Sequence, residues 1–373
     1  MKKVGITGQP GFIGSHLYNT LNLKDDIKLI EFKDEFFENE KVLENFVKQC
    51  DTIVHLAAMN RHEDQNVIYE TNISLVKSLI NACEQTNSTP QIIFSSSLQE
   101  EQDNLYGKSK IEGRKLFENW AEKNNAKFAG LIIPNVFGPF GKPNYNSVVA
   151  TFCYKLTHNE QPQILNDGTV NLIYVNQLVE VFYQAIIGEL SNDSIFSYKV
   201  PHTSSKKVSE ILNLLEGYKE NYLGNGIIPD LEDEFEKSLF NTFVCYIPNE
   251  HYPLIYTKHA DDRGHFVEIA KVETKGQFSF STTKPGITRG NHFHTRKAER
   301  FAVIKGKAKI KLRKIDSDEV ITYTLDGENP AFVDMPIWYT HNIKNIGNEE
   351  LITLFWINEP YNQEDPDTYF VEV

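Results

Sequence analysis

The chain of 373 residues carries 51 Asp and Glu against 38 Lys and Arg, a formal net charge of -13. This acidic balance argues against nucleic acid as a partner, because phosphate contacts need clustered Lys and Arg. The length predicts two domains, no run of 18 apolar residues suggests a membrane span, and four single cysteines with no secretion signal lead us to expect a cytoplasmic protein.

The first segment has the order strand, glycine turn, helix. An apolar run from Lys3 to Thr7 precedes Gly8-x-x-Gly11-x-x-Gly14, after which apolar residues recur at helical spacing. A dinucleotide-binding turn requires this order, since the pyrophosphate lies at the N–H groups that begin the helix. We predict cofactor contacts at Gly8, Gly11, Phe12, Ile13 and Gly14.

The choice between NAD and NADP turns on the end of the second strand. Ile27 to Glu31 is strand-like, and Glu31 stands 23 residues after Gly8. An acid at this place often accepts a hydrogen bond from the ribose 2′-hydroxyl, which favours NAD. Lys33 could instead meet a 2′-phosphate, so the residues leave both cofactors open.

The next strands add small and polar residues at their ends. Asp51 to Ala58 is a buried strand that runs into Leu56, Ala57 and Ala58, where a cofactor can lie close to the backbone. Asn72 lies on a helix with an apolar face, and a further strand from Ile92 ends in Ser95-Ser96-Ser97. Parallel strands interleaved with helices predict a doubly wound α/β domain.

Tyr106 and Lys110 follow this serine-ended strand. Four residues apart on a helix, they share a face, and the ammonium group lowers the pKa of the phenol and assists proton transfer. Only nine positions separate Ser97 from Tyr106.

These motifs resemble the extended short-chain dehydrogenase/reductase (SDR) family over residues 1–243, with a Rossmann-like parallel sheet. Members mostly act on nucleotide sugars. The resemblance implies that Tyr106 is the acid, Lys110 its helper and Asn72 part of a proton relay. By position it also implies that Ser97 bonds the reacting carbonyl, but the loop after the serines is shorter than usual, so either Ser96 or Ser97 could be the working hydroxyl. Asn135 in PNVFGP and residues 168–175 match where this family holds its sugar nucleotide, but Asn171 stands where many relatives have arginine.

From about residue 244 the hydrophobic period changes. Ala308, Ile310 and Leu312 alternate with Lys and Arg, the pattern of a half-buried strand, and Gly, Pro, Asn and Asp turns separate further strands. We predict an all-β barrel or jelly roll over residues 244–373.

This second domain carries a metal-binding pattern. His292 and His294 share one face of a strand, and Glu299 and His341 complete three imidazoles and a carboxylate. Such a set suits zinc, iron, nickel or manganese, and we expect a divalent ion such as zinc. The two motifs closely resemble those of the cupin family, except that Trp338 replaces a usual glycine.

Residues 261–268 and the segment from Arg289 to His292 also resemble the deoxysugar 3,5-epimerase branch of the cupins. That branch usually uses the histidine equivalent to His292 as a base, which a metal ligand would not allow here. Tyr339 is our candidate proton donor or base. Arg263 and Arg289 are candidates for gripping phosphate.

Together the two halves resemble the CapF-type family of bifunctional capsular polysaccharide enzymes. The resemblance implies epimerisation at carbon 3 of a UDP-2-acetamido-2,6-dideoxy-4-hexulose by the cupin. The SDR domain then reduces carbon 4 with NADPH to UDP-2-acetamido-2,6-dideoxy-L-talose, towards UDP-N-acetyl-L-fucosamine. It also implies a homodimer. Two alternatives stay open: a reductase whose cupin is structural or an iron oxygenase, and a nucleotide-sensing protein without turnover.

Overall fold

The computed structural model describes residues 1–255, 259–261, 264–266, 271–272, 277–359 and 363–373. Contacts between residues divide the chain into two compact units, residues 1–137 with 169–206, and residues 138–168 with 207–373. None of the helices in the described residues is both long enough and apolar enough to cross a membrane.

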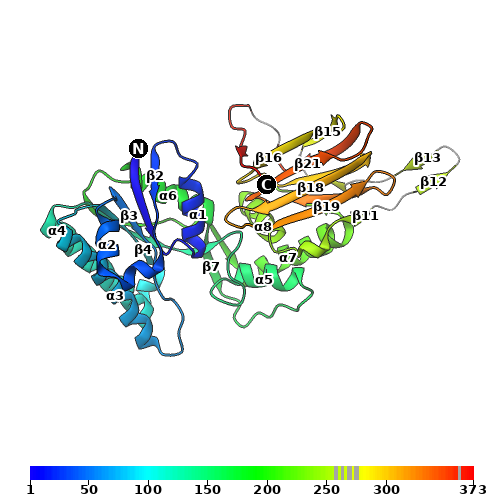
Figure 1. Cartoon of the computed structure of the whole chain (residues 1–373). Helices are drawn as coiled ribbons and strands as arrows, with labels where there is room; N and C mark the ends of the chain where they lie inside the picture. Colours follow the sequence, from blue (N-terminus) through cyan, green and yellow to red (C-terminus); the bar gives the residue numbers. More distant parts are fainter. Residues whose placement is uncertain (256–258, 262–263, 267–270, 273–276, 360–362) are drawn as a thin grey trace. The chain divides into compact units, whose positions relative to one another are not determined.

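The first unit is built on a six-stranded, all-parallel sheet in the order β2-β1-β3-β4-β5-β8. Helices α2, α3 and α4 lie on one side of this sheet and α1 and α6 on the other (Figure 1). A small second sheet has the order β6-β7-β9. The elements are β1 (Lys2–Thr7), α1 (Phe12–Leu21), β2 (Ile27–Ile30), η1 (Asp34–Glu38), α2 (Glu40–Val47), β3 (Thr52–His55), α3 (Gln65–Thr86), β4 (Gln91–Ser97), η2 (Leu98–Glu101), α4 (Leu105–Asn124), β5 (Phe128–Ile133), β6 (Asn135–Phe137), β7 (Thr169–Tyr174), α6 (Val175–Ile187), β8 (Ile195–Lys199) and β9 (Ser204–Lys207).

Local sequence fixes the ends of the long helices α3 and α4. Asp64 caps α3 by accepting the Asn66 N–H at 2.8 Å, and Asn104 caps α4 by accepting the Gly107 N–H at 2.7 Å. Each helix ends at an asparagine in the left-handed conformation, Asn87 and Asn125, which asparagine tolerates better than most residues. Their apolar faces pack against the sheet in a core that includes Phe94, Phe117 and Trp120.

The second unit combines helices with an antiparallel β-sandwich. Its helices are α5 (Val148–Thr157), α7 (Val208–Gly217), the π-helix η3 (Tyr218–Gly224), α8 (Glu234–Val244) and η4 (Asn249–His251). Its strands are β10 (Ile227–Ile228), β11 (Leu254–Ile255), β12 (His259–Asp261), β13 (Gly264–Phe266), β14 (Lys271–Val272), β15 (Gln277–Thr283), β16 (Thr288–Phe293), β17 (Glu299–Lys305), β18 (Lys307–Lys314), β19 (Val320–Asp326), β20 (Ala331–Met335), β21 (Tyr339–Asn345), β22 (Leu351–Ile357) and β23 (Tyr369–Phe370).

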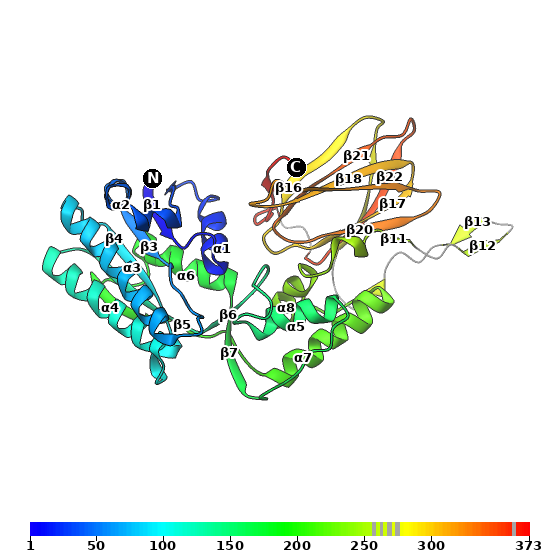
Figure 2. The same ribbon diagram turned by 60° about the horizontal axis from the view of Figure 1, so that its bottom comes forward.

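Two five-stranded sheets form the sandwich within the described residues. Their orders are β11-β20-β17-β22-β15 and β19-β18-β21-β16-β23, and they lie as two layers (Figure 2). Ala308, Ile310 and Leu312 on β18 are buried between them, as their alternation predicted. The α/β domain followed by an all-β domain confirms the predicted fold class.

The compact units differ from a simple division of the sequence at residue 243. Helices α5, α7 and α8 belong to the unit that contains the sandwich, because side chains before residue 244 pack onto it. Asn241 on α8, for example, donates to the carbonyl of Arg296 at 3.2 Å. The predicted boundary between the reductase and cupin domains at residues 243 and 244 therefore stays a prediction.

A buried cluster of charged and tyrosine side chains connects η3 to the sandwich. Arg300 on β17 and Asp334 on β20, each 4% exposed, form a bidentate pair with N–O distances of 2.7 and 3.2 Å. Tyr222 on η3 and Tyr252 both donate to the same carboxylate. Arg300 also lies 3.8 Å from the centre of the Phe332 ring.

We expect Asp334→Ala to destabilise the protein by about 3–5 kcal/mol, because it leaves a buried guanidinium without its counter-charge. Thermal unfolding measures the loss. The matched control is Glu349→Ala, which breaks the exposed Lys305–Glu349 pair of the same sandwich and should not move the unfolding temperature. Equal unfolding temperatures for the two variants would contradict the role of the buried cluster.

Candidate functional site

Two positions of the glycine turn between β1 and α1 have no room for a side chain. Gly8 has φ +71°, and a Cβ added to it would lie 2.7 Å from the backbone nitrogen of Ala57. A Cβ on Gly14 would lie 2.3 Å from the Gly8 carbonyl oxygen. Gly11 begins α1 without a side-chain cap, so the N–H groups of Phe12 and Ile13 stand where a helix binds an anion.

The other predicted cofactor residues lie around this turn. Leu56 donates its N–H to the Thr7 carbonyl at 3.2 Å, and Ala57 donates to the Thr7 hydroxyl at 3.3 Å, so the segment through Ala58 runs beside Gly8. Glu31 and Lys33 follow β2 as an exposed ion pair 3.3 Å apart. The pair offers an acceptor for a ribose 2′-hydroxyl and a cation for a 2′-phosphate. It therefore leaves the choice between NAD and NADP open.

Tyr106 and Lys110 lie on the first turns of α4, next to the end of β4. The Lys110 ammonium is buried, donates to the Ser95 carbonyl at 2.9 Å and lies 5.6 Å from the centre of the Tyr106 ring. Burial lowers the pKa of Lys110 to about 8, although the Glu100 carboxylate raises it. A lysine of this kind beside a phenol suits proton transfer near neutral pH.

The two candidate serines occupy different environments. The Ser96 hydroxyl is buried and donates to Glu100, whereas Ser97 is half-buried and accepts the Gln99 N–H at 3.2 Å as the cap of η2. Because the Ser96 hydroxyl already donates its hydrogen bond to Glu100, Ser97 is the better placed of the two to bind a substrate.

Asn72 makes a set of structural hydrogen bonds. Its amide accepts the Met59 N–H at 2.7 Å and donates to the Met59 carbonyl and to the Ser109 hydroxyl. Ser109 in turn donates to the Tyr106 carbonyl at 2.7 Å. Asn72 thus links α3 to the turn of α4 that carries Tyr106, and its place in a proton relay stays a prediction.

The predicted substrate contacts are spread over both halves. Asn135 on β6 is exposed and donates to the Asn171 carbonyl at 3.3 Å, so the two residues of the predicted sugar-nucleotide region are neighbours. Arg289 is exposed on β16. Arg263 lies outside the described residues.

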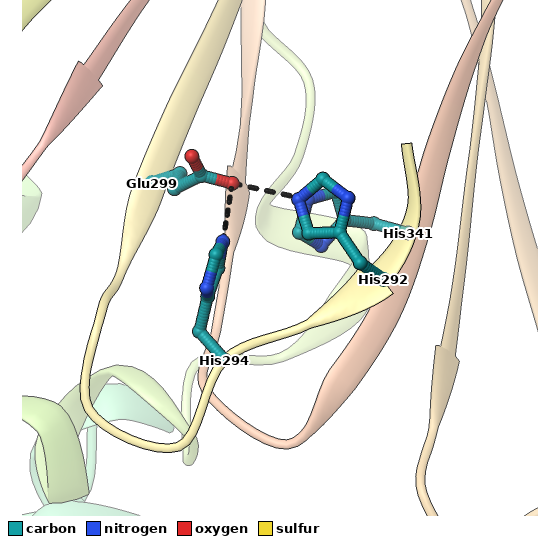
Figure 3. A group of neighbouring side chains, drawn as sticks. All are labelled: His292, His294, Glu299 and His341. Carbon is teal, nitrogen blue, oxygen red and sulfur yellow. Dashed lines mark ion pairs between the residues drawn. The ribbon is translucent and has the colours of Figure 1, made fainter. Parts of the chain in front are cut away.

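Four side chains in the sandwich converge on one point (Figure 3). His292 on β16, His294 just after it, Glu299 at the start of β17 and His341 on β21 each offer a ligand atom, and these atoms lie within 4.8 Å of one another. The Glu299 carboxylate is 3.3 Å from His294 Nε2 and 3.0 Å from His341 Nε2. The predicted ligands are therefore neighbours in space.

Two side chains of the cluster, His292 and Glu299, favour the protonation state that binds a metal ion, whereas for His294 burial is outweighed by the neighbouring Glu299, which raises its pKa. Burial, followed by His341 and His294, lowers the pKa of His292 to about 4, so its imidazole is neutral at neutral pH. Burial opposes ionisation of Glu299, but the neighbouring histidines outweigh it and lower the pKa of this carboxyl group. Neutral imidazoles and a carboxylate are the forms that bind a divalent metal.

Backbone carbonyls orient two of the imidazoles. His294 Nδ1 contacts the Asp367 carbonyl, and His341 Nδ1 lies 3.2 Å from the Tyr339 carbonyl. This leaves both Nε2 atoms facing the centre of the cluster, as in metal sites whose second shell fixes the tautomer. Within the described part of the chain, His294 Nε2, His341 Nε2 and Glu299 Oε2 are buried and have no hydrogen-bond partner outside the cluster, which fits a bound divalent ion.

Asp367 is a contributor that the sequence analysis missed. Its carboxylate accepts the Thr295 hydroxyl at 2.7 Å and the Arg296 N–H at 3.0 Å, which closes the turn between His294 and Glu299. It lies 73 positions from His294 in sequence, and no local pattern links such distant residues.

The turn before His341 keeps a glycine-like conformation despite Trp338. This residue has φ +61°, and its ring stacks on Phe293. Its backbone N–H donates to the His294 carbonyl at 2.8 Å. Tyr339 follows, with its ring 6.3 Å from that of Phe140, and burial raises the pKa of its hydroxyl. A high phenol pKa favours a proton donor over a base, and the role of Tyr339 stays a prediction.

Comparisons with known proteins cover both halves. The NAD dependent epimerase/dehydratase family matches residues 4–193, and the polysaccharide biosynthesis C-terminal domain matches residues 259–369. The UDP-2-acetamido-2,6-beta-L-arabino-hexul-4-ose reductase of Pseudomonas aeruginosa is 32% identical over 379 residues, which cover 100% of this chain and 99% of that protein. The crystal structure of capsular polysaccharide assembling protein CapF from Staphylococcus aureus has 36% identity and a TM-score of 0.63, with 100% of both chains covered.

The chain belongs to the CapF-type family. This confirms the family resemblance that the motifs suggested, including the extended SDR domain at the N-terminus. The spore coat polysaccharide biosynthesis protein SpsL of Bacillus subtilis is 28% identical over 120 residues, 30% of this chain and 80% of that protein.

Proposed function

We propose that the protein is a bifunctional enzyme of capsular polysaccharide or O-antigen precursor synthesis. It epimerises carbon 3 of a UDP-2-acetamido-2,6-dideoxy-4-hexulose and then reduces carbon 4. The observation that carries the proposal is the full-length match to a relative named as a reductase of such a UDP-4-keto sugar, in a chain that keeps Tyr106 and Lys110 beside a glycine turn.

The first half performs the reduction. NADPH bound at the glycine turn supplies the hydride. Tyr106 donates its proton to the oxygen of the carbonyl as that oxygen gains negative charge, and Lys110 favours this transfer by its positive charge. Ser97 donates a hydrogen bond to the same oxygen and fixes its position. The talo-configured UDP sugar is the product.

The second half performs the epimerisation. A divalent ion, for which zinc is our proposal, supplies Lewis acidity that stabilises negative charge on the ketone oxygen. His292, His294, Glu299 and His341 would hold this ion. A base of this chain removes the acidic proton from carbon 3, and Tyr339, whose phenol is kept protonated by burial, is our candidate for returning a proton.

The chemistry fixes the order of the two steps. The hydrogen on carbon 3 is acidic only while carbon 4 is a ketone. Reduction converts that ketone to an alcohol, so epimerisation has to come first. A UDP-activated 4-keto-6-deoxy amino sugar is the substrate class that both sites can use.

Two further parts of the proposal concern the assembly and its location. Cys50, Cys83 and Cys153 are buried free thiols and Cys245 is a partly buried one, which agrees with a reducing compartment such as the cytoplasm. A homodimer is the expected assembly, and size-exclusion chromatography with light scattering measures it.

Proton NMR of the UDP-4-keto-6-deoxy-N-acetylhexosamine in deuterium oxide tests the function. We expect deuterium at carbon 3 before any cofactor is added, and reduction at carbon 4 once NADPH is present. Reduction without exchange would leave the second domain a structural module or an oxygenase. Neither exchange nor reduction, with nucleotide still bound, would favour a nucleotide sensor and overturn the proposal.

A further inference from the structure

The short segment between Ser97 and Tyr106 is folded tightly against α4. Residues 98–101 form η2, and Asn104 caps the helix that follows. At Gly107, on the first turn of α4, an added Cβ would lie 2.1 Å from the Gln99 carbonyl oxygen. The segment that carries Ser97 therefore touches the turn that carries Tyr106, and a side chain at position 107 would push them apart.

Glu100 is the anchor of this segment. Its carboxylate receives Arg114 Nε at 3.1 Å and Arg114 Nη2 at 3.0 Å, which is a bidentate pair between η2 and the middle of α4. The Ser96 hydroxyl donates to the same carboxylate. The Glu100 and Arg114 side chains are only 9% and 18% exposed, so water screens this pair weakly.

The anchored carboxylate also acts on the catalytic lysine. Two ionisable side chains from other elements interact with Lys110, Glu100 from η2 and His55 from β3. Burial and then Lys110 lower the pKa of His55 to about 3, so His55 is neutral and Glu100 is the negative charge that balances the ammonium. Burial alone would drive Lys110 further towards its uncharged form.

We propose that Glu100 is a positioning residue for carbonyl reduction: fixed by Arg114 and Ser96, its carboxylate holds the Ser97 segment on α4 and places a negative charge beside Lys110. The inference rests on the proposed reductase function. It assigns a task to the short loop between Ser97 and Tyr106.

The test is the pH dependence of reduction by the full-length Glu100→Gln variant. Glutamine keeps the size of the side chain and can still accept hydrogen bonds, but it removes the charge. Without that charge the pKa of Lys110 falls below about 8, so the pair of Tyr106 and Lys110 loses a proton at lower pH. We expect the basic limb of the kcat profile to move down by ~1 pH unit, a loss of about fivefold near pH 8 that approaches about tenfold at higher pH and is less than about twofold near pH 6.

Glu118→Gln is the matched control. Glu118 also binds Arg114, at 2.9 Å, but it lies one helical turn further along α4, and among the described residues the Ser96 hydroxyl and the Lys110 ammonium interact with Glu100 instead. Its profile should coincide with that of the unchanged protein. NADPH binding, followed by fluorescence, should be the same in all three proteins, and thermal unfolding verifies that each is folded.

The outcomes separate the inference from the function on which it rests. A loss of activity in Glu100→Gln that is equal at all pH values, or an equal shift in Glu118→Gln, would overturn the electrostatic role of Glu100. An unchanged Glu100→Gln profile would overturn the inference while leaving the reductase in place. If the unchanged protein did not reduce the UDP-4-keto sugar, the proposed function itself would fail.

Discussion

Tyr106→Phe is expected to reduce the rate of carbonyl reduction by about 10³-fold, because it removes the phenol that we propose protonates the substrate oxygen while the ring still packs. Lys110 keeps its hydrogen bond to the Ser95 carbonyl, so NADPH affinity changes little. Exchange of the carbon 3 hydrogen for deuterium should continue, since we propose that the second half carries it out. Oxidation of NADPH, followed by absorbance, measures the first effect and proton NMR measures the second.

Tyr183→Phe provides the control for this experiment. Tyr183 lies on α6 and donates to Asp26 at 3.0 Å, so its loss removes one hydroxyl from the same unit away from the glycine turn. Both activities of this variant should match the unchanged protein. Equal loss of reduction and exchange in Tyr106→Phe would contradict two independent sites, and full retention of reduction would reject Tyr106 as the acid.

His294→Ala removes one of four proposed metal ligands and lowers metal affinity by ~10²-fold or more, at least as much as the loss of a second-shell partner. Elemental analysis of the purified variant should find little metal, and the unfolding temperature should fall because ion binding contributes to the stability of the folded site. Deuterium exchange at carbon 3 should be lost. Reduction of a substrate that has already been epimerised should continue.

A chelator and a distant histidine provide the comparisons for this prediction. Removal of metal from the unchanged protein should reproduce the His294→Ala behaviour, and added zinc should restore only the unchanged protein. His158→Ala, in an exposed position at the end of α5, should keep its metal. Unchanged metal content in His294→Ala would reject the ligand assignment.

Motifs that act within a few residues could be read without a structure. The glycine turn, the pair Tyr106 and Lys110, and the pair His292 and His294 each depend on the fixed repeat of a helix or strand, which sets which side chains share a face. The same kind of repeat in Ala308, Ile310 and Leu312 predicted a half-buried strand, which the structure confirms as β18. The family comparison matches an epimerase/dehydratase domain in the first half and a polysaccharide biosynthesis C-terminal domain in the second.

Contacts between distant segments needed the folded chain. Ser96 and Ser97 are equivalent in sequence, and only the position of Glu100 shows which hydroxyl is occupied inside the protein. Asp367 reaches the turn after His294 because β23 pairs with β16.

The packing of helices on the sandwich also could not be predicted from the sequence. Tyr222 meets Asp334 across 112 positions, and no periodic pattern connects residues so far apart. A repeat of 2 or 3.6 residues determines the face on which a side chain lies, whereas its partner depends on how complete elements pack. Sequence alone therefore predicted the two chemistries and their order along the chain, and the tertiary structure shows which residues hold each candidate catalytic group in place.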